Sequence, residues 1–239
     1  MKVSLQLWSL FKDGVKDLEE LLKLSSEMEY DGVELLKHDV TADEMNALLK
    51  KYNLYAKSAH IGMEFFENNL EEMLEFHKNI GAEYMIIPWM GYEDKSNIKR
   101  VIDVLNKASE TAKKYGIKVG YHNHAQEFEK VDGKYILDIL YENTNEDVVF
   151  ELDVFWVYVG GADPAEMIKK YGKRAELIHL KQSDENKNNV DLPDGVIDMK
   201  NVIETAKYAK YFVVEQEEYK KDSYTSCRAV VDYLKGLMK

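Results

Sequence analysis

Acidic and imidazole side chains stand near the ends of the apolar segments in the second half of the chain. Asp153 lies near the end of VVFELDV, His179 lies in LIHLK, and Glu215 follows YFVV. Upstream, GYHNH carries His122 and His124, which are two residues apart and therefore point to the same side of an extended chain. Two carboxylates and two imidazoles that converge can ligate a divalent cation such as Mn²⁺, Co²⁺, Zn²⁺ or Mg²⁺.

The elements that carry these residues repeat along the whole chain. Short runs rich in β-branched or aromatic residues alternate with stretches of helical period. The runs predict eight strands at 3–8, 32–36, 54–60, 84–89, 118–124, 148–154, 177–181 and 211–216. The stretches between them predict eight helices at 18–28, 42–49, 70–80, 98–115, 135–142, 165–171, 199–209 and 223–237.

Eight strand–helix units with strands buried on both faces are typical of a parallel sheet. A doubly wound open sheet and a closed barrel both have this pattern. No G-x-G-x-x-G loop follows the first strand, or any other. The regular repeat therefore favours an α/β fold of the (β/α)₈ TIM-barrel type, as a single domain over residues 1–239.

In such a barrel the carboxyl ends of the strands form the active-site mouth. Each candidate residue also has a structural interpretation, because a strand histidine is often only hydrogen-bonded and an aspartate after a strand is often a helix cap. Those interpretations would have to hold at Asp153, His179 and Glu215 on three successive strands, so a metal site explains the three together better. His38 and His77 lie away from strand ends and are expected to be solvated.

Composition restricts the partners and the compartment. The formal net charge of −12 would repel nucleic acid. Cys227 is the only cysteine, which excludes an intrachain disulfide and is typical of a reducing compartment. The first segment is too soon interrupted by charge for a signal peptide, and no apolar stretch is long enough to cross a bilayer. We expect a cytoplasmic protein with no nucleic-acid or membrane partner; a homo-oligomer stays open.

Several segments resemble the sugar phosphate isomerase/epimerase family of the xylose isomerase-like barrel superfamily. The most specific is ELDVFWVYVGGADPAEMIKKYGKRAELIHLKQSD, and GYHNHAQEF, VVEQEEY, SAHIG, QLWS and DGVEL match too. The resemblance implies one divalent metal ion held by Asp153, His179, Glu215 and a residue of the fifth strand. Many relatives carry a glutamate there, in a pattern like LENH, whereas this chain carries His122 in YHNH.

The resemblance also implies proton transfer on a small sugar through an enediolate, with Glu215, His122 and His124 as candidate acids and bases. A glutamate at position 122 would double as a base, so the two-glutamate epimerase mechanism does not transfer directly. Isomerases, epimerases, inosose-type dehydratases and keto-glycoside lyases can share this intermediate. The ligand set leaves the choice among them open.

Other residues near the strand ends are candidates for binding the substrate. Hydrogen bonds to hydroxyl groups are expected from His60, Glu34 and Glu127, and an ionic contact to an oxyanion from Lys181. Tryptophan side chains could form an apolar wall against a sugar ring. The three tryptophans are Trp8, Trp89 and Trp156.

Two rival functions share this superfamily. An endonuclease of the endonuclease IV type needs a three-metal cluster and a basic surface, which the net charge of −12 disfavours. A non-catalytic barrel that binds a sugar is disfavoured by the intact set of Asp153, His179 and Glu215, although the histidine at position 122 leaves it open.

Overall fold

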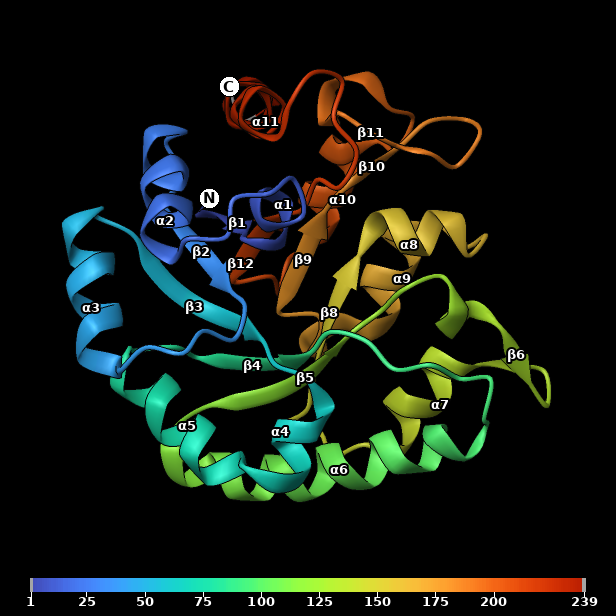
Figure 1. Cartoon of the computed structure of the whole chain (residues 1–239). Helices are drawn as coiled ribbons and strands as arrows, with labels where there is room; N and C mark the ends of the chain where they lie inside the picture. Colours follow the sequence, from blue (N-terminus) through green and yellow to red (C-terminus); the bar gives the residue numbers. More distant parts are fainter. Residues whose placement is uncertain (1, 238–239) are drawn as a thin grey trace.

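Eight parallel strands form a closed barrel in the computed structural model, which describes residues 2–237. The order around the barrel is β1-β12-β9-β8-β5-β4-β3-β2 (Figure 1). The (β/α)₈ barrel predicted from the sequence is therefore confirmed. The strands are β1 (Val3–Gln6), β2 (Gly32–Leu35), β3 (Tyr55–His60), β4 (Tyr84–Ile87), β5 (Lys118–His122), β8 (Val149–Asp153), β9 (Leu177–Leu180) and β12 (Tyr211–Val214).

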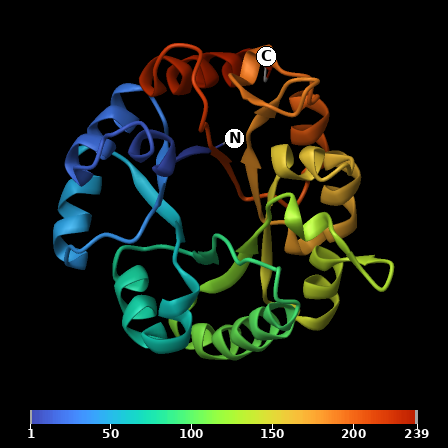
Figure 2. The ribbon, with the colours of Figure 1, turned by 45° about the vertical axis from the view of Figure 1, so that its right-hand side comes forward.

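A ring of helices surrounds the strands (Figure 2). Capping residues define several helix starts: Thr41 forms the expected capping box with Glu44, and Asp163 caps a helix that has Pro164 in its first turn. The eight expected helices are present as α2 (Leu18–Glu27), α3 (Ala42–Lys51), α5 (Leu70–Asn79), α6 (Ser96–Ala112), α7 (Ile136–Asn143), α9 (Pro164–Tyr171), α10 (Met199–Thr205) and α11 (Ser223–Leu237).

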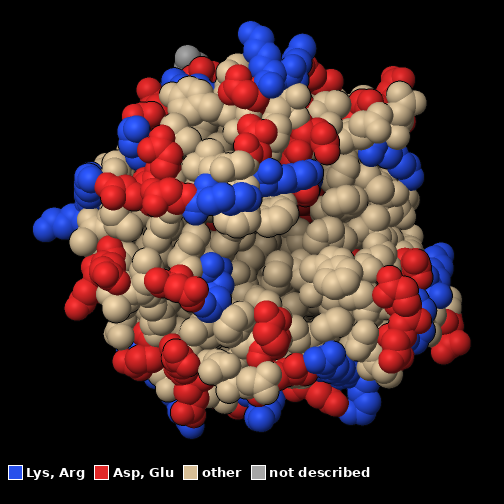
Figure 3. Space-filling model, viewed as in Figure 1, with Lys and Arg blue, Asp and Glu red and all other residues tan. Residues whose placement is uncertain are grey.

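Additional short elements interrupt the regular pattern, and most of them follow the carboxyl ends of strands. They are too short to produce a hydrophobic period, so the sequence pattern did not predict them. The face seen in Figure 1 is hollowed at its centre, with acidic and basic side chains around the hollow (Figure 3). The short elements are α1 (Trp8–Phe11), α4 (Met63–Asn68), α8 (Val154–Val159), the hairpins β6 (Lys130–Val131) with β7 (Lys134–Tyr135) and β10 (Gln182–Ser183) with β11 (Asn189–Val190), and the 3₁₀ turns Lys113–Tyr115, Gln126–Phe128, Gly172–Arg174 and Leu192–Asp194.

Two separate apolar layers flank the barrel wall. Along β4, Met85 and Ile87 belong to the large core between sheet and helices, whereas Ile86 belongs to a small cluster that includes Val149 and Leu177. This alternation places the small cluster inside the barrel. Glu151 is two residues after Val149, and His179 is two residues after Leu177, so both polar side chains also face the inside of the barrel. They lie directly above the small apolar cluster.

Gly120 allows a close approach inside this barrel. It lies on β5, two residues before His122, and therefore faces the interior. A Cβ atom at this position would lie 2.6 Å from the carbonyl oxygen of Val149 and 2.8 Å from Cδ1 of Ile86. The glycine thus lets β5 lie against β8 just below the histidine.

No helix within residues 2–237 is both long and apolar enough to span a membrane.

Candidate active site

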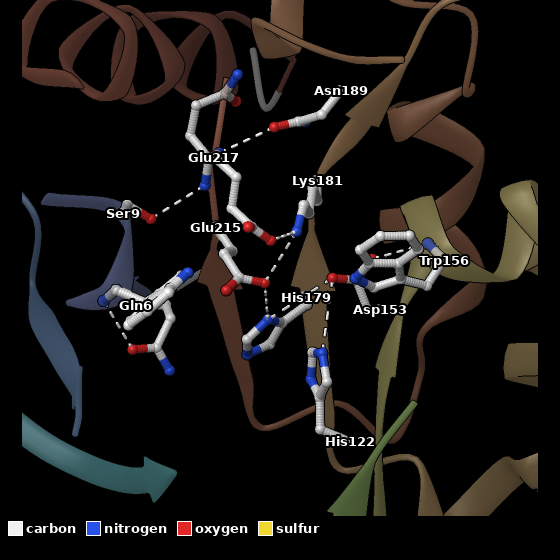
Figure 4. A network of polar contacts seen from close by, with 12 residues as sticks. Gln6, Ser9, His122, Asp153, Trp156, His179, Lys181, Asn189, Glu215 and Glu217 are labelled. Carbon is white, nitrogen blue, oxygen red and sulfur yellow. Dashed lines mark hydrogen bonds and ion pairs between the residues drawn. The ribbon is translucent and has the colours of Figure 1, made fainter. Parts of the chain in front are cut away.

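Four side chains from successive strands of the second half converge at the carboxyl end of the barrel (Figure 4). Asp153 ends β8 and pairs in register with His179 on β9. Glu215 directly follows β12, and His122 ends β5. All four residues are at most 6% exposed, so their polar atoms are withdrawn from solvent and face one another.

The distances within this group suit a cation better than hydrogen bonds. His122 Nε2 lies 3.9 Å from Asp153 Oδ2, and His179 Nδ1 lies 4.0 Å from the same oxygen. His179 Nδ1 also lies 3.5 Å from Glu215 Oε2. Asp153 Oδ2 and His179 Nδ1 are buried without a hydrogen-bond partner. Because one ligand atom from each residue lies within 4.8 Å of the others, an ion about 2.0–2.3 Å from each atom fits this set.

The two carboxylate oxygens of Asp153 have different roles. Oδ1 accepts a hydrogen bond of 3.1 Å from the backbone N–H of Trp156 and thereby caps α8. The backbone N–H of Asp153 donates to Asn123 Oδ1 at 3.1 Å, which ties the end of β8 to the end of β5. Burial raises the pKa of Asp153 to about 7. The helix-cap interpretation is therefore correct for one oxygen, while the other stays free for a ligand.

A buried lysine lies beside the carboxylate that follows β12. Lys181 is 1% exposed, and its Nζ lies 3.4 Å from Glu215 Oε2 and also pairs with Glu217. Burial acts to raise the pKa of Glu215, but Lys181 and His179 outweigh it and hold that pKa well below the usual range. Glu215 is therefore ionised at neutral pH.

His124 lies at the edge of the group, on the segment after β5. Its ring packs against Trp156 at a centroid distance of 5.0 Å, and its Nδ1 is buried without a partner. Burial lowers the pKa of His124 to about 4, so the ring is neutral at pH 7. Glu127 holds this segment: it accepts hydrogen bonds of 2.7 Å from the backbone N–H of His124 and from the hydroxyl of Tyr121. Burial raises the pKa of Glu127 to about 7.

A cavity of about 570 Å³ opens onto these residues. Its apolar wall includes two exposed tryptophans, with Trp8 38% and Trp89 56% exposed. The ring of Trp8 stacks on Phe11 at 5.6 Å. Polar residues in the lining include His60, His122, His124, Glu215 and Glu217.

The residues expected to bind substrate divide into two groups. His60 and Trp89 line the cavity, whereas Glu34, Glu127, Trp156 and Lys181 do not. Glu34 is fully buried below the cavity, where its Oε2 accepts a hydrogen bond of 2.6 Å from Gln6 Nε2. The Nε1 atom of Trp156 is buried, and the centroid of its ring lies 4.9 Å from Lys181 Nζ.

The expectation that His77 is solvated was wrong. His77 is 2% exposed, and its Nδ1 donates a hydrogen bond of 2.7 Å to the carbonyl oxygen of Met73 one turn earlier in α5. Burial lowers its pKa. His38 is only partly exposed and contributes to the cavity lining. The position of a single polar residue on a helix thus does not show which face of the helix is buried.

Three polar residues near the site were not among the site residues expected from the sequence. Glu151 and Gln6 are fully buried inside the barrel, and Glu217 lines the cavity. The available signal was alternation, because Glu151 shares a strand face with Asp153 and Glu217 shares one with Glu215. A charged residue inside an apolar strand, on the same face as a proposed ligand, is the pattern that indicates Glu151, whereas Gln6 is uncharged and Glu217 lies after the end of β12.

Comparisons with known proteins identify the family of the chain and support its fold. An inosose dehydratase from Geobacillus kaustophilus (strain HTA426) is 28% identical over 163 residues, a match that spans 57% of this chain and only 52% of that protein. The structure of a sugar phosphate isomerase/epimerase from Parabacteroides distasonis ATCC 8503 superposes with a TM-score of 0.83 at 24% identity and covers 98% of this chain and 93% of its own.

The structure of an IOLI protein with a binding zinc atom gives a TM-score of 0.78 at 16% identity and covers 99% of this chain and 98% of its own. At such identities the structural likeness supports the fold alone. Residues 7–236, nearly the whole chain, match the family described as xylose isomerase-like TIM barrel. The chain therefore belongs to the xylose isomerase-like TIM barrel family.

Proposed function

We propose that this chain is a divalent-metal-dependent isomerase or epimerase that moves a proton on a small sugar or keto-sugar. The observation that carries the proposal is the pair of buried atoms without partners, Asp153 Oδ2 and His179 Nδ1, beside His122 and Glu215. These four residues would hold one ion of Mn²⁺, Co²⁺, Zn²⁺ or Mg²⁺. A bound divalent ion supplies a Lewis acid that stabilises negative charge on substrate oxygens.

Glu215 and His124 are the groups best placed to move the proton. Both line the cavity. Glu215 is ionised because its pKa is held low, and His124 is neutral because its pKa is about 4, so each can accept a proton from the carbon next to a carbonyl. Return of the proton to the neighbouring carbon isomerises the sugar, and return to the opposite face epimerises it. His122 directs Nε2 toward Asp153 and is assigned to the ligand set.

Lys181 and the tryptophans shape the surroundings of the reaction. Lys181 is buried against Glu215 and Glu217, so it keeps the first carboxylate charged and fixes its position. Trp8 and Trp89 expose large apolar surfaces at the cavity wall, where the C–H face of a sugar ring can pack.

Dehydration is the second candidate reaction. It is favoured by the relative described as an inosose dehydratase, although that match covers about half of each protein. The same proton abstraction, followed by loss of a β-hydroxyl as water, yields a dehydrated product, and loss of a β-alkoxy group would yield the keto-glycoside lyase reaction. The product therefore distinguishes these reactions from isomerisation and epimerisation.

The test is a screen of ketoses, inososes and 3-keto sugars in deuterated water with protein supplied with Mn²⁺ or Co²⁺. We expect solvent deuterium at one carbon next to a carbonyl, observed by NMR and mass spectrometry. Glu215→Gln at saturating metal is the matched control, since it keeps the shape of the side chain and removes its basicity, and saturation offsets the loss of a charged ligand. Binding of a sugar by the wild type without any exchange or elimination would favour the non-catalytic barrel and contradict the proposal.

A further inference from the structure

A second layer of polar side chains crosses the barrel directly beneath the four proposed ligands. Glu34 comes from β2, His60 from the end of β3 and Glu151 from the middle of β8. Both glutamates are fully buried, and His60 is 9% exposed. Isolated carboxylates are very costly to bury in a barrel interior, so their neighbours must account for them.

The neighbours are the two proposed histidine ligands. Glu151 Oε2 lies 3.1 Å from His122 Nδ1 and 3.2 Å from His179 Nε2. Glu34 Oε2 lies 2.9 Å from His179 Nε2. These are hydrogen-bond distances, and they involve the ring nitrogens opposite those that face Asp153.

We propose that Glu151 and Glu34 are positioning residues that select the tautomers of His122 and His179. A carboxylate only accepts hydrogen bonds, so the ring nitrogen facing it must carry the proton. The N–H then lies on Nδ1 of His122 and on Nε2 of His179. The lone pairs of the opposite nitrogens are directed at the proposed cation, and the inference therefore rests on the proposed metal site.

His60 holds the two glutamates together. Its Nε2 lies 2.6 Å from Glu151 Oε2 and 3.1 Å from Glu34 Oε2. A ring N–H between two buried carboxylates offsets their mutual repulsion. Gln6 Nε2 donates to Glu34 Oε2 from the other side at 2.6 Å. These contacts of His60 and Gln6 therefore hold both glutamates in place even without a bound metal ion.

The alternative occupant of this layer is a second ion. One ligand atom each from His60, His122, Glu151 and His179 also lie within 4.8 Å of one another. Glu151 Oε2 forms hydrogen bonds of 2.6 Å with His60 Nε2 and 3.1 Å with His122 Nδ1, whereas the contacts of the outer group are 3.5–4.0 Å. An inner ion would also require His179 to give up both ring protons, since its Nδ1 faces the outer group. One ion and one layer of hydrogen bonds fit better.

The test is a titration of metal-free protein with Co²⁺, followed by the visible absorption spectrum, which reports the ligand geometry independently of catalysis. The variants are Glu151→Gln and Glu34→Gln. The matched control is Glu176→Gln, because Glu176 is 6% exposed and lies just before β9, at the other end of the barrel. Circular dichroism and thermal melting of the metal-free proteins show which variants fold.

For Glu151→Gln we expect the Co²⁺ dissociation constant to rise about 10–100-fold, with a changed spectrum, because His122 loses its carboxylate acceptor and His179 loses one of its two carboxylate neighbours. Glu34→Gln should have a smaller effect, since it faces only His179 among the ligands, and it provides the second variant if Glu151→Gln does not fold. Glu176→Gln should bind Co²⁺ as the wild type does.

Wild-type affinity and spectrum in folded Glu151→Gln, or in Glu34→Gln if only that variant folds, would overturn the inference and leave the proposed function intact. Two Co²⁺ ions per wild-type chain and one in Glu151→Gln would make Glu151 a ligand and also overturn it. A wild type that binds no Co²⁺ would instead contradict the proposed function itself.

Discussion

The two ends of the barrel both contain buried carboxylates, but they pair them differently. At the amino end, Glu176 precedes β9 and accepts a hydrogen bond of 2.6 Å from the hydroxyl of Tyr84. Lys210 Nζ lies 2.9 Å from the same oxygen, and Lys118 pairs with the other oxygen. Burial acts to raise the pKa of Glu176, but these partners outweigh it and lower that pKa. This carboxylate is fully paired within the protein.

At the carboxyl end, the carboxylates exceed the cations that could pair with them. Lys181 is shared by Glu215 and Glu217, while Oδ2 of Asp153 has no partner. Buried polar groups are normally hydrogen-bonded, so an orphaned oxygen beside an orphaned ring nitrogen marks a place kept for a ligand. The amino end thus uses its charges for stability, whereas the carboxyl end leaves buried atoms without protein partners, at the end of the barrel where active sites lie in this fold.

The largest effect is expected at the orphaned oxygen. Asp153→Asn keeps a good helix cap for α8 but replaces the free Oδ2 with an amide. We expect metal affinity to fall by well over the roughly 100-fold that loss of a supporting hydrogen bond costs, with nearly all activity lost. Equilibrium dialysis with Mn²⁺ measures the affinity. If Asp153→Asn still bound Mn²⁺ as the wild type does, the unpartnered oxygen at the carboxyl end would not be a metal ligand, and the two ends would not differ in this respect.

A smaller effect on the reaction rate is expected from Glu215→Gln. The amide cannot accept the substrate proton, so the turnover rate should fall about 10²–10⁴-fold. Deuterium exchange into the substrate under saturating metal measures this step apart from metal loss. An unchanged exchange rate would transfer the role of base to His124.

The amino end should respond in stability alone. Glu176→Gln leaves Lys118 and Lys210 without a charged partner, and both are partly solvated, with side chains 40% and 53% exposed. We expect the free energy of unfolding to fall by about 1–2 kcal/mol, with metal affinity and turnover unchanged. Urea denaturation and a Mn²⁺ titration of the same sample measure both. A loss of metal affinity here would show that the two ends are coupled.

The smallest effect concerns pH at the amino end. Because folding lowers the pKa of Glu176 below its ordinary value of 4.5, the unfolded chain binds more protons in that range. The stabilisation is therefore present above this value and is lost as the pH falls through the folded pKa. The difference in unfolding free energy between wild type and Glu176→Gln should therefore be constant well above pH 4.5 and should shrink as the pH falls below that value. A difference that grows in acid would contradict the pairing described for Glu176.

The fold followed from the alternation of apolar runs and helical stretches, which the sequence shows directly. Every expected strand is present, starting at or one residue after its predicted position. Strands end up to two residues early, because the chain turns away where the mouth residues begin. The short α1 and α8 could not be predicted, since four or six residues carry no readable period.

Only the layer of proposed ligands in the candidate site could be predicted from the sequence, and the layer of polar residues beneath it could not. Asp153, His179 and Glu215 converge because the carboxyl ends of neighbouring parallel strands meet. Glu151 lies one layer deeper, where its contact with His122 depends on the pairing of β8 with β5 and on their register. That register comes from packing in three dimensions, which the strand pattern alone does not contain.

The metal site is tested most simply by the metal content of the purified chain after loading with Mn²⁺ and dialysis. We expect one ion per wild-type chain and none in Asp153→Asn, with wild-type content in Glu176→Gln. A folded wild-type protein that retains no ion, or an Asp153→Asn variant that retains as much as the wild type, would contradict the proposed metal site.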